Sequence, residues 1–198
     1  MSGIAVVDYR AGNLTSVVKA LHFLGAEPEV TSDPDVVSRA SKVVLPGVGH
    51  FAATKFLDER GLSEAIRSRA KEGVPFLGIC VGLQWMFEGS TEAPSVAGAG
   101  FLEGQCERFE TIEKVPHVGW NSLEVRSDSR LMKGVASGDF VYFTHSYRAS
   151  LHHDTVAVTD YGGPFTAAVE AGNLMGVQFH PEKSGKTGLT VLKNFLDL

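Results

Sequence analysis

The spacing of apolar residues differs between the two halves of this 198-residue chain. In the first half, short apolar runs alternate with segments of helical spacing, which is typical of a parallel sheet with helices on both faces. The clearest helix covers 14–24, where Gly25 follows as a stop signal and one apolar stripe is formed by Leu14, Val17, Val18, Leu21 and Leu24. Buried strands are expected at 4–7, 29–31, 43–45 and 76–79, and further helices at 62–70 and directly after residue 80.

The second half has a different pattern, a series of short strands. We expect strands at 106–109, 123–125, 140–143, 155–159, 166–170 and 175–179, and a closing helix at 188–196. Turn signals at Gly162-Gly163-Pro164 and Gly172-Asn173 indicate that part of this half is antiparallel. The sequence therefore predicts an α/β fold in one domain, 1–198: a mostly parallel sheet flanked by helices, with additional antiparallel strands in the C-terminal half.

Composition narrows the class of protein without identifying it. The apolar share of 43% and the charged share of 21% are ordinary for a soluble globular protein. A net charge of −5 argues against a broad nucleic-acid footprint, and no apolar run approaches the length of a membrane span. The N-terminus lacks the basic region and long apolar stretch of a signal peptide, so we expect a cytoplasmic protein. The two cysteines do not make a disulfide framework, and Cys106 is interpreted as structural.

The first candidate for chemistry is a cysteine between two glycines, in Gly78-Ile79-Cys80-Val81-Gly82. The segment directly follows an apolar run, which is the arrangement of a nucleophile elbow, a tight strand-to-helix turn that presents the nucleophile. Glycines are needed there because strand and helix come so close that a Cβ would collide. The positive end of the following helix favours the thiolate.

The second candidate is Phe179-His180-Pro181-Glu182, near the C-terminus. In an extended chain, residues two apart point to the same side, so Glu182 can orient His180 while His180 serves Cys80. Nucleophile, base and orienting acid are the three roles of a catalytic triad. Taken singly, a cysteine in an apolar region or a lone histidine is more often structural. The motif in which each residue stands is what favours catalysis.

Longer stretches of sequence add a specific resemblance. They run in order over nearly the whole chain: Asp8-Tyr9-Arg10-Ala11-Gly12-Asn13, Leu45-Pro46-Gly47-Val48-Gly49-His50-Phe51, the Cys80 elbow, Pro116-His117-Val118-Gly119-Trp120-Asn121, Thr144-His145-Ser146-Tyr147, and Gly176-Val177-Gln178-Phe179-His180-Pro181-Glu182-Lys183-Ser184. With these motifs the chain resembles the class I glutamine amidotransferases of the Cys-His-Glu type. Within that class it resembles the glutaminase subunits of imidazole glycerol phosphate synthase, from histidine biosynthesis. Departures are limited to Val81, Leu83 and Val118, which stand in place of other apolar residues.

The resemblance implies an enzyme that hydrolyses the side-chain amide of glutamine, with no metal and no cofactor. Cys80 would attack the amide and form a thioester, while His180 transfers protons and Glu182 orients His180.

Further site residues are expected around this triad. The tetrahedral oxyanion needs donors fixed in advance. We expect one donor to be the backbone N–H of Val81 in the elbow, and the other that of Val48 in its glycine-flanked turn. By resemblance, Gln84 and the backbone at Ser146 and Tyr147 hold the glutamine substrate.

The resemblance also implies a partner subunit, because ammonia released into water would be wasted. In the resembled family a (β/α)8-barrel cyclase takes the ammonia through an internal channel and forms imidazole glycerol phosphate, so we expect a heterodimer with such a subunit. The residues expected at the mouth that faces the partner are Gly12, Asn13, Trp120, Tyr142 and Lys183.

Three other functions stay open at this point. Another stand-alone glutaminase subunit, such as the one feeding pyridoxal phosphate synthesis, would share the chemistry and differ in its partner. A thiol hydrolase or peptidase would act on esters or γ-glutamyl peptides without ammonia transfer. A binding module on this fold would lack catalysis, although the complete set of Cys80, His180 and Glu182 argues against it.

Weaker features of the sequence are not assigned a function. Gly185-Lys186-Thr187 is like the end of a phosphate-binding loop, but His180 stands where that pattern needs a glycine. The adjacent His152-His153 has no partner at metal-ligand spacing and is interpreted as a solvated turn. The irregular segment 88–104 is either a surface loop or an edge of the active-site mouth, and the sequence favours neither.

Overall fold

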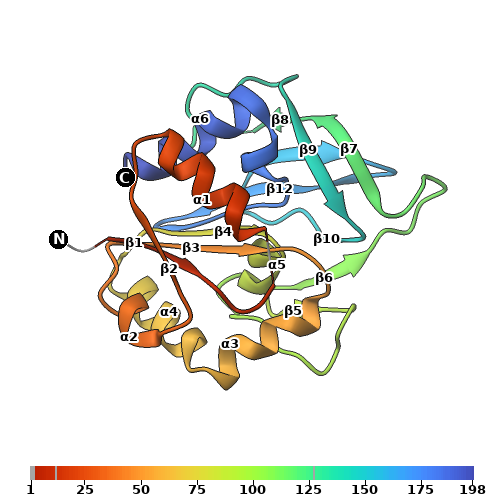
Figure 1. Cartoon of the computed structure of the whole chain (residues 1–198). Helices are drawn as coiled ribbons and strands as arrows, with labels where there is room; N and C mark the ends of the chain where they lie inside the picture. The colour runs from red at the N-terminus through yellow and green to blue at the C-terminus, as the bar shows by residue number, and fades with distance from the viewer. Residues whose placement is uncertain (1–2, 12, 127) are drawn as a thin grey trace.

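The structure of this chain, a computed structural model, describes residues 3–11, 13–126 and 128–198. An eight-stranded sheet runs through its middle in the order β2-β1-β3-β4-β13-β12-β11-β8 (Figure 1). Its parallel part is β1 (Ile4–Val7), β2 (Pro28–Thr31), β3 (Lys42–Gly47), β4 (Phe76–Cys80) and β13 (Leu174–Val177). Its antiparallel part is β12 (Pro164–Ala171), β11 (Thr155–Asp160) and β8 (Glu124–Val125). This arrangement confirms the predicted α/β fold class.

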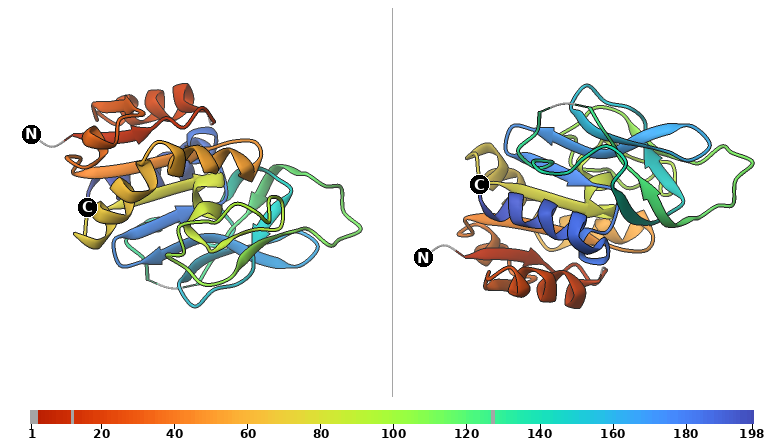
Figure 2. Two further views of the ribbon diagram at one scale, coloured as in Figure 1. Left: turned by 90° about the horizontal axis from the view of Figure 1, so that it is seen from below. Right: turned by 90° about the horizontal axis from the view of Figure 1, so that it is seen from above.

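Helices cover both faces of the parallel part, as the alternating pattern predicts. One side carries α1 (Leu14–Phe23) and α6 (Gly185–Leu196), and the other carries α2 (Pro34–Val37), α3 (Lys55–Glu59) and α4 (Leu62–Lys71), as Figure 1 and Figure 2 show. The short helix α5 (Val81–Met86) follows β4 directly and is buried along its whole length. The expected stripe of α1 packs on the core, with Val17 and Leu21 fully inside it.

The second half adds two small sheets beside the main one. The strands β10 (Tyr147–Ala149), β6 (Gln105–Arg108) and β5 (Gly89–Ser90) form the first, and β7 (His117–Ser122) pairs with β9 (Phe140–His145) in a two-stranded ribbon. The sequence did not predict β5, β7, β10, α2, α3 or the one-turn helices η1 (Phe51–Thr54) and η2 (Pro181–Lys183). Most of these are too short for a period to be visible, and the apolar residues Val118 and Trp120 of β7 lie on its exposed face rather than in the core.

The carboxyl ends of three adjacent parallel strands lie at one edge of the sheet. Gly47 at the end of β3 is in register with Cys80 at the end of β4, and Ile79 is in register with Val177 at the end of β13. Segments that follow neighbouring parallel strands emerge side by side, which is where ligands bind in such sheets. The segments after β3, β4 and β13 therefore frame one site. Among the described residues, no helix is both long and apolar enough to cross a membrane.

Candidate active site

Cys80 occupies the strained turn between β4 and α5. Its φ is 54°, a left-handed value that Arg10 alone shares among the non-glycine residues described. The flanking glycines are needed for space. A Cβ at Gly78 would lie 2.5 Å from the carbonyl oxygen of Gly82, and a Cβ at Gly82 would collide with the carbonyl oxygen of Leu45. The collision that the sequence predicts is thus present at both glycines. Backbone strain of this kind persists where the surrounding packing over-determines it, and it is common at active sites.

His180 and Glu182 form a buried pair beside the elbow. Nδ1 of His180 donates to Oε1 of Glu182 over 2.8 Å, and both side chains are 1% exposed. The geometric reason given by the sequence analysis is wrong, because β13 ends at Val177 and 181–183 form the one-turn helix η2 rather than an extended strand. The turn folds the carboxylate back onto the ring. The backbone N–H of His180 also donates to the carbonyl of Tyr142 over 2.8 Å, which fixes the ring beside β9.

The neighbours of His180 determine its protonation. Burial by itself lowers the pKa of this imidazole, but Cys80 and Glu182 outweigh burial and raise the pKa to about 10. His180 is therefore an imidazolium at neutral pH, next to the cysteine sulfur. Its Nε2 is buried and makes no hydrogen bond of ordinary geometry. Catalytic hydrogen bonds are often long before substrate binds, so the lack of a short hydrogen bond from Nε2 of His180 fits an enzyme in its resting state.

A cavity of about 240 Å³ opens over Cys80. Six of the residues predicted from the sequence line it: Val48, Cys80, Val81, Gln84, Ser146 and Tyr147. The two expected oxyanion donors differ in their surroundings, because Val48 is 36% exposed on its turn whereas Val81 is buried at the start of α5. The structure thus gathers the predicted nucleophile, donors and substrate-binding residues around one space.

Gln84 is buried in the wall of this cavity and does not lie on a helix surface. Its Nε2 donates to the carbonyl of Tyr147 over 2.9 Å and to Oε1 of Gln178 over 3.2 Å. The Tyr147 carbonyl also accepts from Nδ1 of His145 over 2.9 Å, and the carbonyl of Ser146 accepts from a backbone N–H over 3.1 Å. The backbone carbonyls of Ser146 and Tyr147, the segment expected to hold substrate, therefore both accept hydrogen bonds from other groups of the protein.

His117 and His145 are buried, neutral rings at the cavity: His145 lines it, and His117 lies behind His145. Burial lowers the pKa of His117 to about 4, and burial together with nearby positive charges lowers the pKa of His145 to about 3. The Tyr147 carbonyl accepts from Nδ1 of His145, so Nε2 of His145 accepts in turn from Nδ1 of His117 over 3.2 Å. These rings hold the wall of the cavity in place and bring no charge to it.

Two residues that the sequence analysis did not single out touch the site. Glu92 lines the cavity, and its Oε2 accepts from the backbone N–H of Phe51 over 2.7 Å, which supports the interpretation of 88–104 as an edge of the mouth. Gln178 is wholly buried, and its Nε2 donates to Sγ of Cys80 over 3.5 Å. The position of Gln178, two residues before His180, was a signal for it. Nothing in the sequence marked Glu92 among its acidic neighbours.

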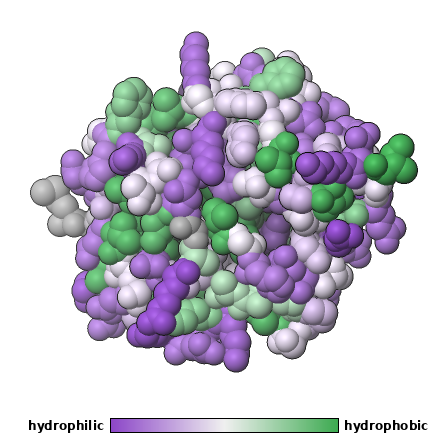
Figure 3. Space-filling view, turned by 45° about the vertical axis from the view of Figure 1, so that its right-hand side comes forward, coloured by the Kyte–Doolittle hydropathy of each residue, from purple (hydrophilic) through white to green (hydrophobic). Residues whose placement is uncertain are grey.

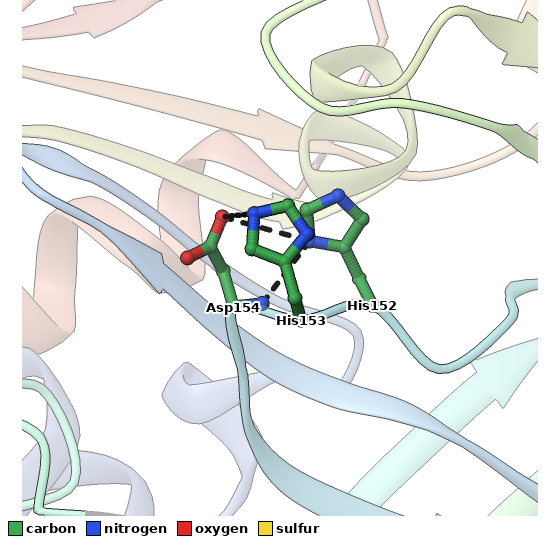
Figure 4. A group of neighbouring side chains, drawn as sticks. All are labelled: His152, His153 and Asp154. Atoms are coloured by element: carbon green, nitrogen blue, oxygen red, sulfur yellow. Dashed lines mark hydrogen bonds and ion pairs between the residues drawn. The ribbon is translucent and has the colours of Figure 1, made fainter.

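His152, His153 and Asp154 gather at one turn, as Figure 4 shows. Oδ2 of Asp154 lies 3.2 Å from Nε2 of His153 and 3.6 Å from Nδ1 of His152, so the histidine pair has an acidic neighbour that the sequence analysis overlooked. Nδ1 of His152 already accepts the backbone N–H of Asp154 over 3.2 Å. That bond uses the lone pair of Nδ1, whereas Nε2 of His152 is buried and has no hydrogen-bond partner among the described residues. The side chain of His152 is 9% exposed, so the prediction of a solvated turn is wrong for this residue, and we assign the turn no metal.

Comparisons with known proteins decide the family. The family described as "Glutamine amidotransferase class-I" matches residues 5–198. The chain belongs to this family. Proteins named "Imidazole glycerol phosphate synthase subunit HisH" are similar to this amidotransferase over nearly its full length. The one from Moorella thermoacetica is 48% identical over 201 residues, covering 100% of this chain and 96% of the relative. The one from Methanothermobacter thermautotrophicus is 46% identical over 196 residues, covering 98% of each.

Solved structures share the fold of this amidotransferase at low sequence identity. One described as "Crystal structure of glutamine amidotransferase" has a TM-score of 0.78 and 22% identity, covering 98% of both chains. The structure of PurLQS from Thermotoga maritima has a TM-score of 0.76 and 23% identity, covering 100% of this chain and 99% of that one. At these identities the likeness bears on the fold alone.

The residues of this amidotransferase that were expected to face a partner are partly gathered. The ring centroids of Trp120 and Tyr142 are 6.2 Å apart, and Nζ of Lys183 lies 5.7 Å from the centroid of the Tyr142 ring. Asn13 precedes α1, and its side chain makes no capping hydrogen bond there. Gly12 lies outside the described residues.

Proposed function

We propose that this chain, as one domain over 1–198, is the glutaminase subunit of an imidazole glycerol phosphate synthase that works in the cytoplasm. The observation that carries the proposal is Cys80 at a strained elbow, beside the buried pair His180–Glu182 and over a cavity lined by Gln84. This arrangement supports cysteine-dependent hydrolysis of an amide. Relatives named for that synthase, 48% and 46% identical over nearly the whole chain, support the choice among glutaminases.

The reaction begins when Sγ of Cys80 attacks the carboxamide carbon of glutamine. The backbone N–H of Val81, and that of Val48 as the second donor, stabilise the charge that develops on the oxygen. The His180 imidazolium, held by Glu182, gives its proton to the leaving nitrogen, and ammonia departs. A glutamyl thioester stays on Cys80. His180, now neutral, takes a proton from water, which attacks the thioester and releases glutamate.

The charged ends of glutamine are matched by groups around the cavity. Glu92 is the acidic side chain of the described lining, so its carboxylate suits the α-ammonium of the substrate. Because the carbonyls of Ser146 and Tyr147 are used within the protein, this segment contributes backbone N–H groups, which suit the α-carboxylate. Gln84 donates its NH₂ group to the protein, and its carbonyl oxygen is left to accept a bond from the substrate.

The proposal includes a partner that docks over the outer face of the β7–β9 ribbon. Val118, Trp120 and Phe140 on this ribbon are 55%, 55% and 57% exposed, and Trp120 is in register with Tyr142 across the strands. Figure 3, turned toward this side of the molecule, shows apolar patches interrupted by hydrophilic side chains. Exposed aromatic groups rimmed by polar ones are typical of protein interfaces. The ribbon adjoins the site, since the carbonyl of Tyr142 in β9 accepts a hydrogen bond from the backbone N–H of His180.

For this partner we propose a cyclase subunit of (β/α)8-barrel fold that consumes the ammonia. Free ammonia is protonated in neutral water and then is no nucleophile. A glutaminase that supplies ammonia to a synthase therefore needs the ammonia-accepting site of that synthase to be enclosed together with its own cavity.

The test combines a pull-down from the native cytoplasm with an ammonia-transfer assay. Cys80→Ala is expected to abolish synthesis of imidazole glycerol phosphate from glutamine and to leave synthesis from ammonium salt intact. Cys106→Ala, a change at the other thiol, is the matched control and should keep both. Glutamine hydrolysis retained by Cys80→Ala would overturn the choice of nucleophile. Capture of a different synthase would assign the chain to that enzyme, and ester hydrolysis without ammonia transfer would indicate a thiol hydrolase.

A further inference from the structure

Gln178 is a buried polar residue that touches the nucleophile and has no part in the reaction above. It is wholly buried after the end of β13. Its Nε2 lies 3.5 Å from Sγ of Cys80, and its Oε1 lies 3.2 Å from Nε2 of Gln84. An amide in such a place is tolerated only when both of its ends are hydrogen-bonded. Its effect on the cysteine depends on which end faces the sulfur.

A backbone carbonyl decides that orientation. The carbonyl of Tyr147 can only accept, so the end of Gln84 that lies 2.9 Å from it is the NH₂ group. The same NH₂ group faces Gln178, so the atom of Gln178 on that side is its carbonyl oxygen. The NH₂ group of Gln178 is therefore the end that reaches Cys80.

We propose that Gln178 stabilises the thiolate of Cys80 by donating a hydrogen bond to it, in an orientation imposed by Gln84 and the Tyr147 carbonyl. A donor aimed at an anion favours the charged form over the neutral one. Gln178 is then a catalytic residue because it touches the reacting sulfur, and Gln84 gains a second role as the residue that positions it. This inference rests on the proposed role of Cys80 as nucleophile.

The groups closest to the sulfur do not replace Gln178. His180, with Glu182 behind it, supplies a positive charge, but its Nε2 makes no hydrogen bond of ordinary geometry. The carbonyl of Thr144 lies 4.0 Å from Sγ and can only accept, so it favours the protonated thiol. Gln178 is thus the neutral donor with a hydrogen bond to the sulfur.

Other titratable groups near Cys80 work against the thiolate or leave it unaffected. Burial and the charge of Cys80 both raise the pKa of Tyr9, so this phenol stays neutral. Glu92 lines the same cavity, and its negative charge opposes a second anion. His145 also lines the cavity, and burial lowers its pKa to about 3, so it carries no charge.

The test measures the thiolate without glutamine and without a partner. The full chain is treated with the neutral reagent iodoacetamide between about pH 5 and pH 10, and alkylated Cys80 is quantified by mass spectrometry, because the alkylation rate follows the thiolate fraction. Cys106 serves as an internal reporter of folding. It is completely buried, and burial raises its pKa, so its alkylation marks unfolded protein.

Gln178→Met keeps the length of the side chain and removes the donor. We expect the midpoint of the alkylation profile to move up by about one pH unit, which is a roughly tenfold lower rate on the acidic side. Gln178→Glu keeps the shape and reverses the polarity, so it should move the midpoint at least as far. Gln84→Met leaves the donor in place without its orientation and should give a smaller upward shift. Gln105→Met, the same exchange at an exposed residue of β6, should leave the midpoint unchanged.

The wild-type midpoint in a folded Gln178→Met or Gln178→Glu protein overturns the proposal, and so does an equal shift in Gln105→Met. Where one Gln178 variant exposes Cys106, the other decides. A Gln84→Met protein with the wild-type alkylation midpoint would show that Gln84 does not orient Gln178. A wild-type chain that hydrolyses no glutamine even with the loaded cyclase would contradict the glutaminase assignment and leave this measurement valid, so the two failures are distinguishable.

Discussion

The turns that end β3 and β4 lie side by side and are built in opposite ways. The elbow at Cys80 is enclosed: this residue is 3% exposed, and a Cβ at the neighbouring Gly78 would meet backbone at 2.5 Å. The turn after β3 opens to solvent. Val48 is 36% exposed, and a Cβ at Gly49 would meet nothing within 4 Å, although φ there is 103°. Crowding fixes the first turn, whereas the second has free space around it.

The open turn nevertheless begins and ends at fixed points. At Gly47 a Cβ would collide with the hydroxyl of Tyr9, and beyond the turn Glu92 holds the backbone N–H of Phe51 over 2.7 Å. The peptide between Gly47 and Val48 therefore lies between two anchors, with the crowded Gly47 on one side and the exposed Val48 and open Gly49 on the other. The fold thus sets the position of the proposed nucleophile, whereas the direction of the second proposed oxyanion donor is open to control by a ligand or partner.

The largest effect on glutamine hydrolysis is expected from residues at the enclosed elbow. His180→Ala removes the proton donor to the leaving nitrogen and should lower kcat for glutamine hydrolysis by roughly 10⁴-fold or more. Glu182→Gln should be milder, because Glu182 orients and stabilises the imidazolium without transferring the proton itself. Steady-state ammonia release checks the order, with melting curves as the control for folding. Equal residual rates in two folded variants would count against this division of roles.

The pH profile separates the same two roles. Burial lowers the pKa of His180, but Cys80 and Glu182 raise it to about 10, so the imidazolium needed for ammonia departure is lost as pH rises through that value. The rate of hydrolysis should fall with it. In Glu182→Gln one of the charges that raise the pKa is gone, so the alkaline limb should move to lower pH. An alkaline limb that stays at the wild-type pH in Glu182→Gln would show that Glu182 does not raise the pKa of His180.

The elbow was predictable from sequence because its requirements are local. Gly78, Cys80 and Gly82 are neighbours in the chain, and the contact that requires Gly78 lies in the helix that follows the elbow, although the contact that requires Gly82 is with Leu45 in β3. The pairing of His180 with Glu182 was predicted for a wrong reason, since a separation of two residues suits a one-turn helix as well as an extended strand. A short spacing identifies partners without fixing the backbone between them.

The contacts that distant segments make at the site were not predictable. The position of Gln178 beside His180 was a signal for the residue, but its hydrogen bond to Cys80 spans 98 positions of sequence, and Glu92 arrives from an irregular segment. Side-chain hydrogen bonds of this kind leave no period in the sequence. The strand β7 was missed for a related reason: it is a strand because β9 pairs with it, and its two large apolar residues, Val118 and Trp120, lie on its exposed face.

Gly82→Ala should break the enclosed turn. The new Cβ would collide with the carbonyl oxygen of Leu45 in β3, a backbone atom that cannot turn aside, so the free energy of unfolding should fall by about 4 kcal/mol or more. Thermal and denaturant melting measure the change. A variant as stable and as active as the wild type would mean that α5 is free to move away from β3, and the elbow would then not be the fixed element.

The open turn predicts activation by the partner. With the N–H of Val48 turned away from the oxyanion position at rest, the isolated chain should be a poor glutaminase. Docking of the loaded cyclase should then raise the rate roughly 100- to 1000-fold, the effect of one oxyanion donor. The measurement is glutamine hydrolysis by the chain alone, with the cyclase, and with the cyclase plus its nucleotide substrate. Full activity in the chain alone, unchanged by either addition, would sink the idea.

Val48→Pro is the sharper form of this experiment. Proline has no N–H, so the donor is absent in every orientation of the peptide. The basal rate should stay close to that of the isolated wild type, and the stimulation should be lost. A folded Val48→Pro protein with full stimulation would assign the movable donor to another residue.

The smallest effect is expected from Gly49→Ala, the counterpart of Gly82→Ala in the open turn. Nothing lies within 4 Å of the new Cβ, so the effect is confined to a backbone φ of 103°, which side-chain-bearing residues rarely adopt. The free energy of unfolding should fall by about 1–2 kcal/mol, and the stimulation by the cyclase should change because the turn relaxes to another φ. The alkylation midpoint of Cys80 should stay at its wild-type value. Gly25→Ala, also open and at a positive φ of 83°, is the matched control, with a similar loss of stability and unchanged stimulation. A Gly49→Ala protein as unstable as Gly82→Ala, or one with a shifted midpoint, would show that the two turns do not act independently.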